Sequence, residues 1–225
     1  CPQIQAVAQR GVPVVDLANR VDCPGVSSHA RADFGEMTKV TVAYLLNHSG
    51  GRAVRVAWFP GPEGAGWQQD AERGLNEALK GSAATLVHGG YGPADLSGQA
   101  PLIRALLERE PDIDYILGNA EAAAFASRLR HNSGTRYHFE VLSFYTNERL
   151  LQPIAEGQVL AAPTDSPVIQ ARIAVDLAVR LLEKQAVASL ISPRIIMLDK
   201  RNVKQLDPSR LVPPQGQWMI RQPLP

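Results

Sequence analysis

Short apolar runs alternate along the chain with longer segments in which apolar residues recur at helical spacing. Because these runs are continuous and do not alternate with polar residues, they are typical of strands covered on both faces. The predicted strands are residues 12–17, 54–59, 84–87, 113–117, 139–144, 159–162 and 194–198. The predicted helices are residues 34–47, 66–79, 96–110, 121–130, 147–156 and 167–184. This order predicts an α/β fold with a mainly parallel sheet.

Residues at the ends of the predicted helices support the assignment. Asp33 and Asn147 precede helical segments and have side chains suited to N-caps. Gly81 and Gly157 follow helical segments, where glycine commonly ends a helix. Pro167 opens the last predicted helix, at a position where its missing N–H costs nothing.

Three segments interrupt the alternation of strand and helix with polar residues, prolines and glycines. They are residues 22–32, 162–167 and 186–193. Breaks of this composition mark connections rather than regular elements. Three such crossings predict two lobes that exchange chain.

Composition narrows the function. The 225 residues include 23 Lys and Arg against 22 Asp and Glu, a formal net charge of +1. This balance gives no basic face for nucleic acid, so no nucleic-acid partner is expected. No stretch approaches the ~20 apolar residues of a membrane span, so no direct membrane insertion is expected.

The two cysteines are Cys1 and Cys23, and they belong to no CxxC or Cys/His cluster. A zinc or redox site is therefore not indicated. A disulfide between them would close a short loop in an oxidising compartment. The alternative is two separate thiols, and the sequence leaves both open because geometry decides the matter.

No motif for catalysis or for cofactor binding occurs in the sequence. It contains no GxxxxGKS/T or GxGxxG phosphate loop, no HExxH zinc motif and no GxSxG nucleophile motif. The five histidines are scattered without ligand spacing. We therefore expect no catalytic residues, no metal site and no cofactor, and an enzyme is disfavoured.

The candidate binding residues lie near the carboxyl ends of predicted strands, where open α/β sheets bind ligands. Trp58 and Trp67 flank a loop rich in proline and glycine, Tyr145 follows the strand 139–144, and Asp165 lies on a crossing. Aromatic rings and one carboxylate on one edge suit a small cation or a quaternary ammonium group. The simpler interpretation makes the tryptophans core or helix packing and Asp165 a brace of the hinge.

Asn119 also ends a predicted strand, and its amide can both donate and accept hydrogen bonds. Its simpler interpretation is an N-cap of the following helix. A sugar site would also use stacking rings, but it would need more polar partners than this edge supplies.

Several segments together resemble a known family. They are Gly11-Val12-Pro13-Val14-Val15, Pro60-Gly61-Pro62 followed by Ala65-Gly66, and residues 106–114, 141–145 and 161–165, all in one colinear order. The resemblance is to type I periplasmic binding proteins, and within them to the periplasmic sensors of trimethylamine N-oxide. It covers residues 11 to 200, and the wider family includes sugar-binding proteins and LacI-type regulator cores.

The resemblance implies two Rossmann-like lobes with three crossovers, the first lobe being incomplete. The chain begins without Met and directly in a helical pattern, which agrees with the expectation that this sequence starts within the first lobe. The implied division is 1–30 for the end of the first lobe, 31–162 for the second, 163–188 for a return to the first, and 189–225 for the third crossover, a second-lobe strand and a C-terminal tail. The helix 167–182 would then have an apolar face with little to cover it.

The resemblance also implies a function. It predicts a protein of the periplasm that binds trimethylamine N-oxide or a similar methylamine and signals to a membrane sensor histidine kinase in a two-component system. An aromatic cage would be formed by Trp58, Trp67 and Tyr145 with Asp165. Phe34 is a further candidate, since it stands beside Asp33, where relatives are expected to carry an aromatic residue.

Two other functions fit the same fold. The first is a substrate-binding protein that delivers a sugar or similar solute to an ABC transporter. The second is the effector core of a transcription regulator, which an upstream helix-turn-helix would indicate.

Overall fold

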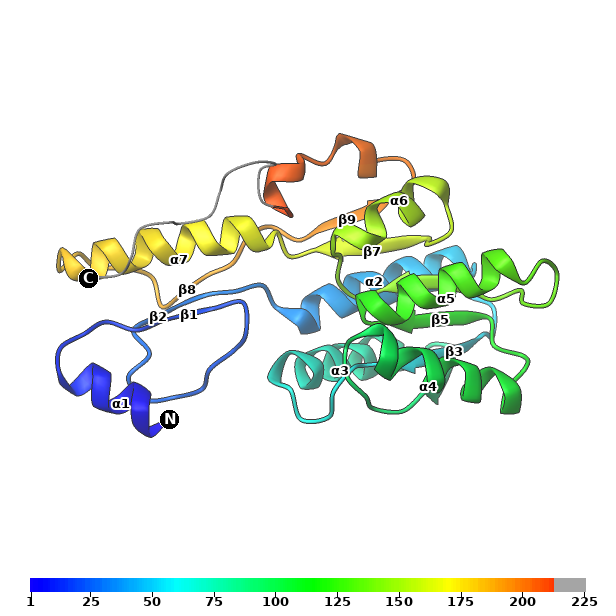
Figure 1. The fold of residues 1–225 in the computed structure, drawn as a ribbon, viewed down its shortest axis with the longest axis horizontal. Helices are drawn as coiled ribbons and strands as arrows, with labels where there is room; N and C mark the ends of the chain where they lie inside the picture. The colour runs from blue at the N-terminus through cyan, green and yellow to red at the C-terminus, as the bar shows by residue number, and fades with distance from the viewer. Residues whose placement is uncertain (213–225) are drawn as a thin grey trace.

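Two sheets joined by chain crossings make up the structure, a computed structural model that describes residues 1–212 (Figure 1). The strands are β1 (Val15–Leu17), β2 (Ser28–Ala30), β3 (Arg55–Phe59), β4 (Thr85–His88), β5 (Tyr115–Gly118), β6 (Glu140–Ser143), β7 (Ala161–Thr164), β8 (Leu190–Ile191) and β9 (Ile196–Asp199). The larger sheet has the order β4-β3-β5-β6-β7-β9, and the smaller has the order β1-β2-β8. All pairs are parallel except β7 with β9.

Seven α-helices and two short 3-10 helices occur within the described residues. They are α1 (Pro2–Gln9), α2 (Phe34–His48), α3 (Gly66–Leu79), α4 (Leu96–Arg109), α5 (Ala120–Asn132), α6 (Glu148–Glu156), α7 (Pro167–Leu182), η1 (Val203–Gln205) and η2 (Pro208–Arg210). In Figure 1, α1, β1, β2 and β8 lie at one end of the molecule and the larger sheet with α2 to α6 lies at the other. The expected C-terminal tail, 213–225, lies outside the described residues.

The larger sheet is apolar on both faces because alternate residues of a strand point to opposite sides. In β3, Val56 and Trp58 pack with α2 and α3, whereas Ala57 and Phe59 pack with α4, α5 and α6. Both sets of side chains are almost fully buried. This two-sided burial explains the continuous apolar runs and confirms the predicted α/β class with a mainly parallel sheet.

The helix ends follow the predicted chemistry. The Asp33 carboxylate accepts a hydrogen bond from the Glu36 N–H at 3.1 Å, and the Asn147 side chain accepts from the Arg149 N–H at 3.1 Å. Gly157 ends α6 with a φ of 77°. Pro167 occupies the first turn of α7. These four predictions are confirmed.

The smaller sheet contains two strands that the pattern did not predict. β2 lies in the first expected crossing, and β8 lies in the third, where the His29 N–H donates to the Ser189 carbonyl at 2.9 Å. They are 3 and 2 residues long, too short to give a periodic signal. In the structure the chain leaves the smaller sheet after Ile191, close to residue 189, where the predicted segment of third crossover, second-lobe strand and tail begins.

The remaining question about the cysteines is resolved by their geometry. Cys1 and Cys23 form a disulfide, with their Cα atoms 5.4 Å apart. The bond ties the start of α1 to the loop between β1 and β2. No residue of α1 is buried, so this covalent link is a main attachment of the helix.

The outer face of α7 is uncovered, as expected. Leu177 is buried against β1 and β2, but Val175 and Leu182 are 65% and 67% exposed. A hollow of about 530 Å³ runs along this face beside Val168 and Val179.

Candidate ligand-binding site

Three aromatic rings meet at the carboxyl edge of the larger sheet. Phe34, Trp67 and Tyr145 have ring centroids 5.9 Å apart in each of the three pairs. All three side chains are half-buried. Tyr145 lies edge-on to both other rings, at 79° and 80°. We call Phe34, Trp67 and Tyr145 the three-ring cluster.

Local structure explains why residues so far apart in sequence meet. Phe34 is the first residue of α2, which begins at the N-cap Asp33. Trp67 lies in the first turn of α3, after the loop that leaves β3. Tyr145 follows β6, where the Ser143 hydroxyl donates to its carbonyl at 2.7 Å. The carboxyl ends of parallel strands and the helix starts that follow them share one edge, so these positions converge.

A second layer of rings supports the cluster from below. Phe144 stacks with Trp67 at 6.0 Å and 29°, and Trp58 packs on Phe144 at 4.9 Å. Both are fully buried. The expectation that Trp58 lines the binding site therefore needs correction, because its side chain is buried between the sheet and helices α2 and α3. The sequence pattern does not single out Phe144, because its role depends on contacts between distant segments.

Asn119 has a structural role. Its Oδ1 accepts from the N–H groups of Glu121 and Ala122 at 3.1 and 3.0 Å, and its Nδ2 donates to the Phe59 carbonyl at 3.2 Å. The residue is fully buried. Its simpler interpretation, the N-cap of α5, is the correct one, and the amide has no free face for a ligand.

Asp165 lies at the second crossing, between β7 and α7, and is 9% exposed. Gln170 Nε2 donates to its carboxylate Oδ2 at 2.9 Å and to its carbonyl at 2.8 Å. The Gln170 Oε1 accepts from the Ala32 N–H of the first crossing at 3.2 Å. Burial raises the pKa of Asp165, and the hydrogen bonds from its own backbone and from Gln170 oppose this.

The phenol of Tyr145 stays protonated across the neutral range. Burial raises its pKa to about 12, although a backbone hydrogen bond from Ala120 lowers it. The nearby carboxylates of Glu121 and Asp165 raise it further. The cluster therefore offers neutral rings in the field of two acidic groups, which favours a positively polarised ligand.

The smaller sheet reaches toward the same helix start. Arg20, in the loop after β1, donates from Nη1 to Asp70 Oδ1 of α3 at 2.9 Å. Asp70 is buried and also pairs with Arg73 at 2.9 Å. This ion pair holds the loop of the smaller sheet against the helix that carries Trp67.

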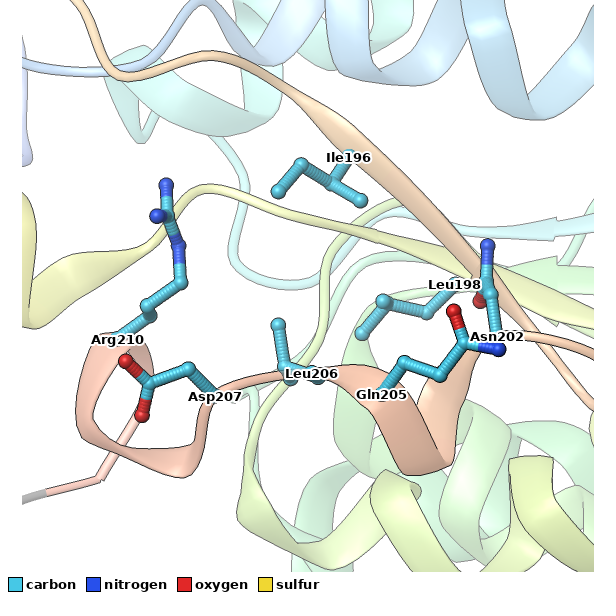
Figure 2. A pocket seen from close by; sticks show the side chains of 7 residues that line it. All are labelled: Ile196, Leu198, Asn202, Gln205, Leu206, Asp207 and Arg210. Atoms are coloured by element: carbon cyan, nitrogen blue, oxygen red, sulfur yellow. The ribbon is translucent and has the colours of Figure 1, made fainter.

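A separate cavity of about 330 Å³ lies between β9, η1 and η2 (Figure 2). Ile196 and Leu198 form its apolar side, and Asn202, Asp207 and Arg210 bring polar groups. None of these residues was predicted as a site, and none belongs to the three-ring cluster. The Asn202 amide is already bonded to the backbone of Asp199 and Met197, at 2.9 Å each, so it braces the turn after β9.

Within residues 1–212, no group of three or more His, Cys, Asp and Glu side chains is arranged to hold a metal ion. In the same part of the chain, no helix combines the length and apolar character needed to cross a bilayer.

The chain belongs to the family of periplasmic binding proteins and the sugar-binding domain of the LacI family, whose model matches residues 1–200. It is 32% identical over 205 residues to the periplasmic protein TorT of Escherichia coli K12, which covers 91% of this chain and 59% of TorT. The chain therefore spans less than two thirds of that relative. The predicted type I periplasmic binding protein fold is confirmed.

Solved structures agree with this family. An ABC transporter solute-binding protein from Bradyrhizobium sp. BTAi1, with bound Bis-Tris, is 35% identical, with a TM-score of 0.83 over 96% of this chain and 65% of that one. TorT in complex with the TorS sensor domain is 26% identical, with a TM-score of 0.78 over 90% of this chain and 70% of that one. These relatives are binding and sensor proteins rather than enzymes.

An ABC transporter periplasmic solute-binding protein from Actinobacillus succinogenes 130z, with bound D-allose, shares the fold. It has a TM-score of 0.83 at 19% identity over 91% of this chain and 75% of that one.

Proposed function

We propose that this chain belongs to a periplasmic binding protein that senses trimethylamine N-oxide or a similar methylamine and signals to a membrane sensor histidine kinase of the TorS type. The three-ring cluster carries the proposal. Three half-buried rings with centroids 5.9 Å apart stand at the edge where this fold binds ligands, beside the acidic groups Asp165 and Glu121.

A trimethylated nitrogen matches this chemistry. Its methyl groups are apolar and carry partial positive charge, so they are attracted to the negative faces of aromatic rings. Each ring contributes ~0.5–2 kcal/mol, more as water is excluded. The Tyr145 hydroxyl, protonated because its pKa is raised to about 12, supplies a donor for the N-oxide oxygen.

The relatives support the same ligand chemistry. TorT, 32% identical, has been solved with the TorS sensor domain in the presence of trimethylamine N-oxide. The 35% identical Bradyrhizobium protein has bound Bis-Tris. The nitrogen of trimethylamine N-oxide carries a formal positive charge, and the tertiary amine of Bis-Tris is cationic when protonated, so both present the kind of group that aromatic faces attract.

A transporter function is the second candidate, because the 35% identical relative is an ABC transporter solute-binding protein. A sugar is the less suitable ligand for the three-ring cluster. The Asn119 side chain already caps α5, and the Asp165 carboxylate already accepts a hydrogen bond from Gln170. Few free polar groups remain there to match sugar hydroxyls.

Signalling would follow if the kinase binds the open and closed arrangements of the lobes with different affinities. A ligand that binds between lobes favours the closed arrangement, and a kinase that binds one arrangement better reads that change. The effect is reciprocal, so the kinase sensor domain must shift the ligand affinity by the same factor.

Calorimetry tests this proposal. The protein is titrated with trimethylamine N-oxide, with tert-butanol as a neutral molecule of the same shape, and with D-allose. We expect saturable binding of trimethylamine N-oxide, much weaker binding of tert-butanol and no heat from D-allose. Binding of D-allose alone would replace the proposal with the transporter function. Adding the TorS sensor domain tests the kinase arm, since an unchanged affinity for trimethylamine N-oxide would contradict it.

A further inference from the structure

The outer tip of the Trp67 indole abuts the backbone of Gly61, in the loop between β3 and α3. A Cβ at position 61 would lie 2.7 Å from Trp67 Cη2. The two flanking ring carbons, Cζ2 and Cζ3, would lie at 3.5 and 3.6 Å, so the approach is end-on to the ring edge. No Cβ fits at 2.7 Å from a ring carbon, so only glycine permits this contact.

Gly61 is itself held in place. Its carbonyl accepts a hydrogen bond from the Gly92 N–H, in the loop after β4, at 3.0 Å. The residue is buried and has a φ of +106°, in the region that favours glycine. The loop therefore cannot easily retreat from the indole.

The opposite constraint on Trp67 comes from the core. Phe144 stacks on the indole at 6.0 Å and is fully buried. Phe144 on one face and Gly61 at the outer tip both restrict where the indole can lie, and in this position its centroid is 5.9 Å from those of Phe34 and Tyr145.

We propose that Gly61 is a positioning residue for the binding site, setting where the Trp67 indole stands and thereby the size of the three-ring cluster. This inference rests on the proposed function, which makes the three-ring cluster the ligand site. A side chain at position 61 would displace the indole, and the three rings could no longer present one continuous aromatic surface to a trimethylated nitrogen.

Gly64, in the same loop, provides a matched control. Its φ is +80°, so alanine there meets similar backbone strain, but a Cβ at position 64 would have nothing within 4 Å. Any difference between Gly61→Ala and Gly64→Ala therefore reports the contact with Trp67.

The experiment combines near-ultraviolet circular dichroism of the ligand-free protein with titration of trimethylamine N-oxide. We expect Gly61→Ala to change the aromatic signal and to weaken binding about tenfold, the scale of one lost ring contact. Gly64→Ala is expected to keep both the signal and the affinity of the original protein. Equal behaviour of the two variants would overturn the proposal.

A double-mutant cycle separates positioning from general damage. Trp67→Phe removes the outer tip of the indole, so Gly61→Ala should cost less affinity and less thermal stability in that background. Additive effects would contradict the proposal.

If Gly61→Ala alone fails to fold, recovery of folding in the double variant still supports the proposal, and failure of the double variant to fold contradicts it. If the original protein does not bind trimethylamine N-oxide, the proposed function fails, while the spectra and the stability cycle still test Gly61.

Discussion

Gln170 holds Asp165 from two directions, with its Nε2 donating to the carboxylate at 2.9 Å and to the carbonyl at 2.8 Å. The other end of the same amide accepts from the Ala32 N–H at 3.2 Å. One buried side chain thus joins the first and second crossings. In the proposed function, closure of two lobes would bend the chain at its crossings, and this link lies at two of them.

Replacing this amide should destabilise the protein. Gln170→Ala leaves the Ala32 N–H and the Asp165 carboxylate without their partner, and we expect a loss of ~1–3 kcal/mol in the free energy of unfolding. Gln170→Glu should be worse, since it brings a second carboxylate against Asp165. Urea denaturation measures both. Gln185→Ala, on the exposed end of the α7 region, is the control and should stay within ~0.5 kcal/mol. An unchanged free energy of unfolding in Gln170→Ala would show that this link does not stabilise the protein.

Asp165 gives a pH-dependent prediction. Its folded pKa is raised above 3.8, mainly by burial, so its stability contribution is fully present below pH 3.8 and is lost as pH rises through the folded pKa. Asp165→Asn keeps an acceptor for Gln170 but does not titrate. We expect this variant to be more stable than the original protein at pH 7, with a difference that shrinks toward pH 4. The same variant should bind trimethylamine N-oxide more weakly, because one acidic group is lost. A constant stability difference across this range would contradict the account.

The two tryptophans near β3 should behave differently. Trp67→Ala removes a ring of the three-ring cluster, and we expect the affinity for trimethylamine N-oxide to fall by about tenfold or more. Trp58→Phe acts in the core, where it should cost ~1–3 kcal/mol of stability. Its ligand affinity should stay within about twofold, since Phe144 separates it from the cluster. Calorimetry and thermal unfolding distinguish the two effects. A loss of affinity in Trp58→Phe matching that of Trp67→Ala would mean that Trp58 contacts the ligand after all.

The disulfide should matter locally. Cys1 and Cys23 are 22 residues apart, and closing a loop of this size stabilises by ~3 kcal/mol in the chain-entropy view. Because α1 buries no residue, we expect Cys1→Ser/Cys23→Ser to expose α1 to limited proteolysis first. The affinity for trimethylamine N-oxide should not change, since the three-ring cluster lies on the larger sheet. Unaltered proteolysis of α1 would show that its other contacts suffice.

The larger sheet was predictable because its strands are short, mainly apolar runs, and every strand except β9 is followed by an α-helix. β2 and β8 could not be predicted in this way. They have 3 and 2 residues. β2 pairs with the nearby β1, but its pairing with β8 joins segments 160 residues apart, as the bond from Ser28 Oγ to the Ala188 carbonyl illustrates.

The candidate site was predictable in part. Trp67 and Tyr145 follow strand ends, and the rule that parallel sheets bind ligands at that edge identifies them. The prediction for Trp58 failed because this residue lies one position before the end of β3, on a buried face of the sheet. A sequence pattern does not show how deeply such a side chain is buried. Phe144 contacts Trp67 from a distant strand end, so no local pattern marks it. Gly61 lies in the loop that leads into the helix of Trp67, but the sequence does not show that its backbone meets the tip of the indole.

A crystal structure of the protein with trimethylamine N-oxide is the decisive test of the three-ring cluster as the ligand site. We expect the ligand nitrogen to lie within ~6 Å of the ring centroids of Phe34, Trp67 and Tyr145. A ligand bound in the cavity beside β9, or one that leaves the three rings uncontacted, would contradict it.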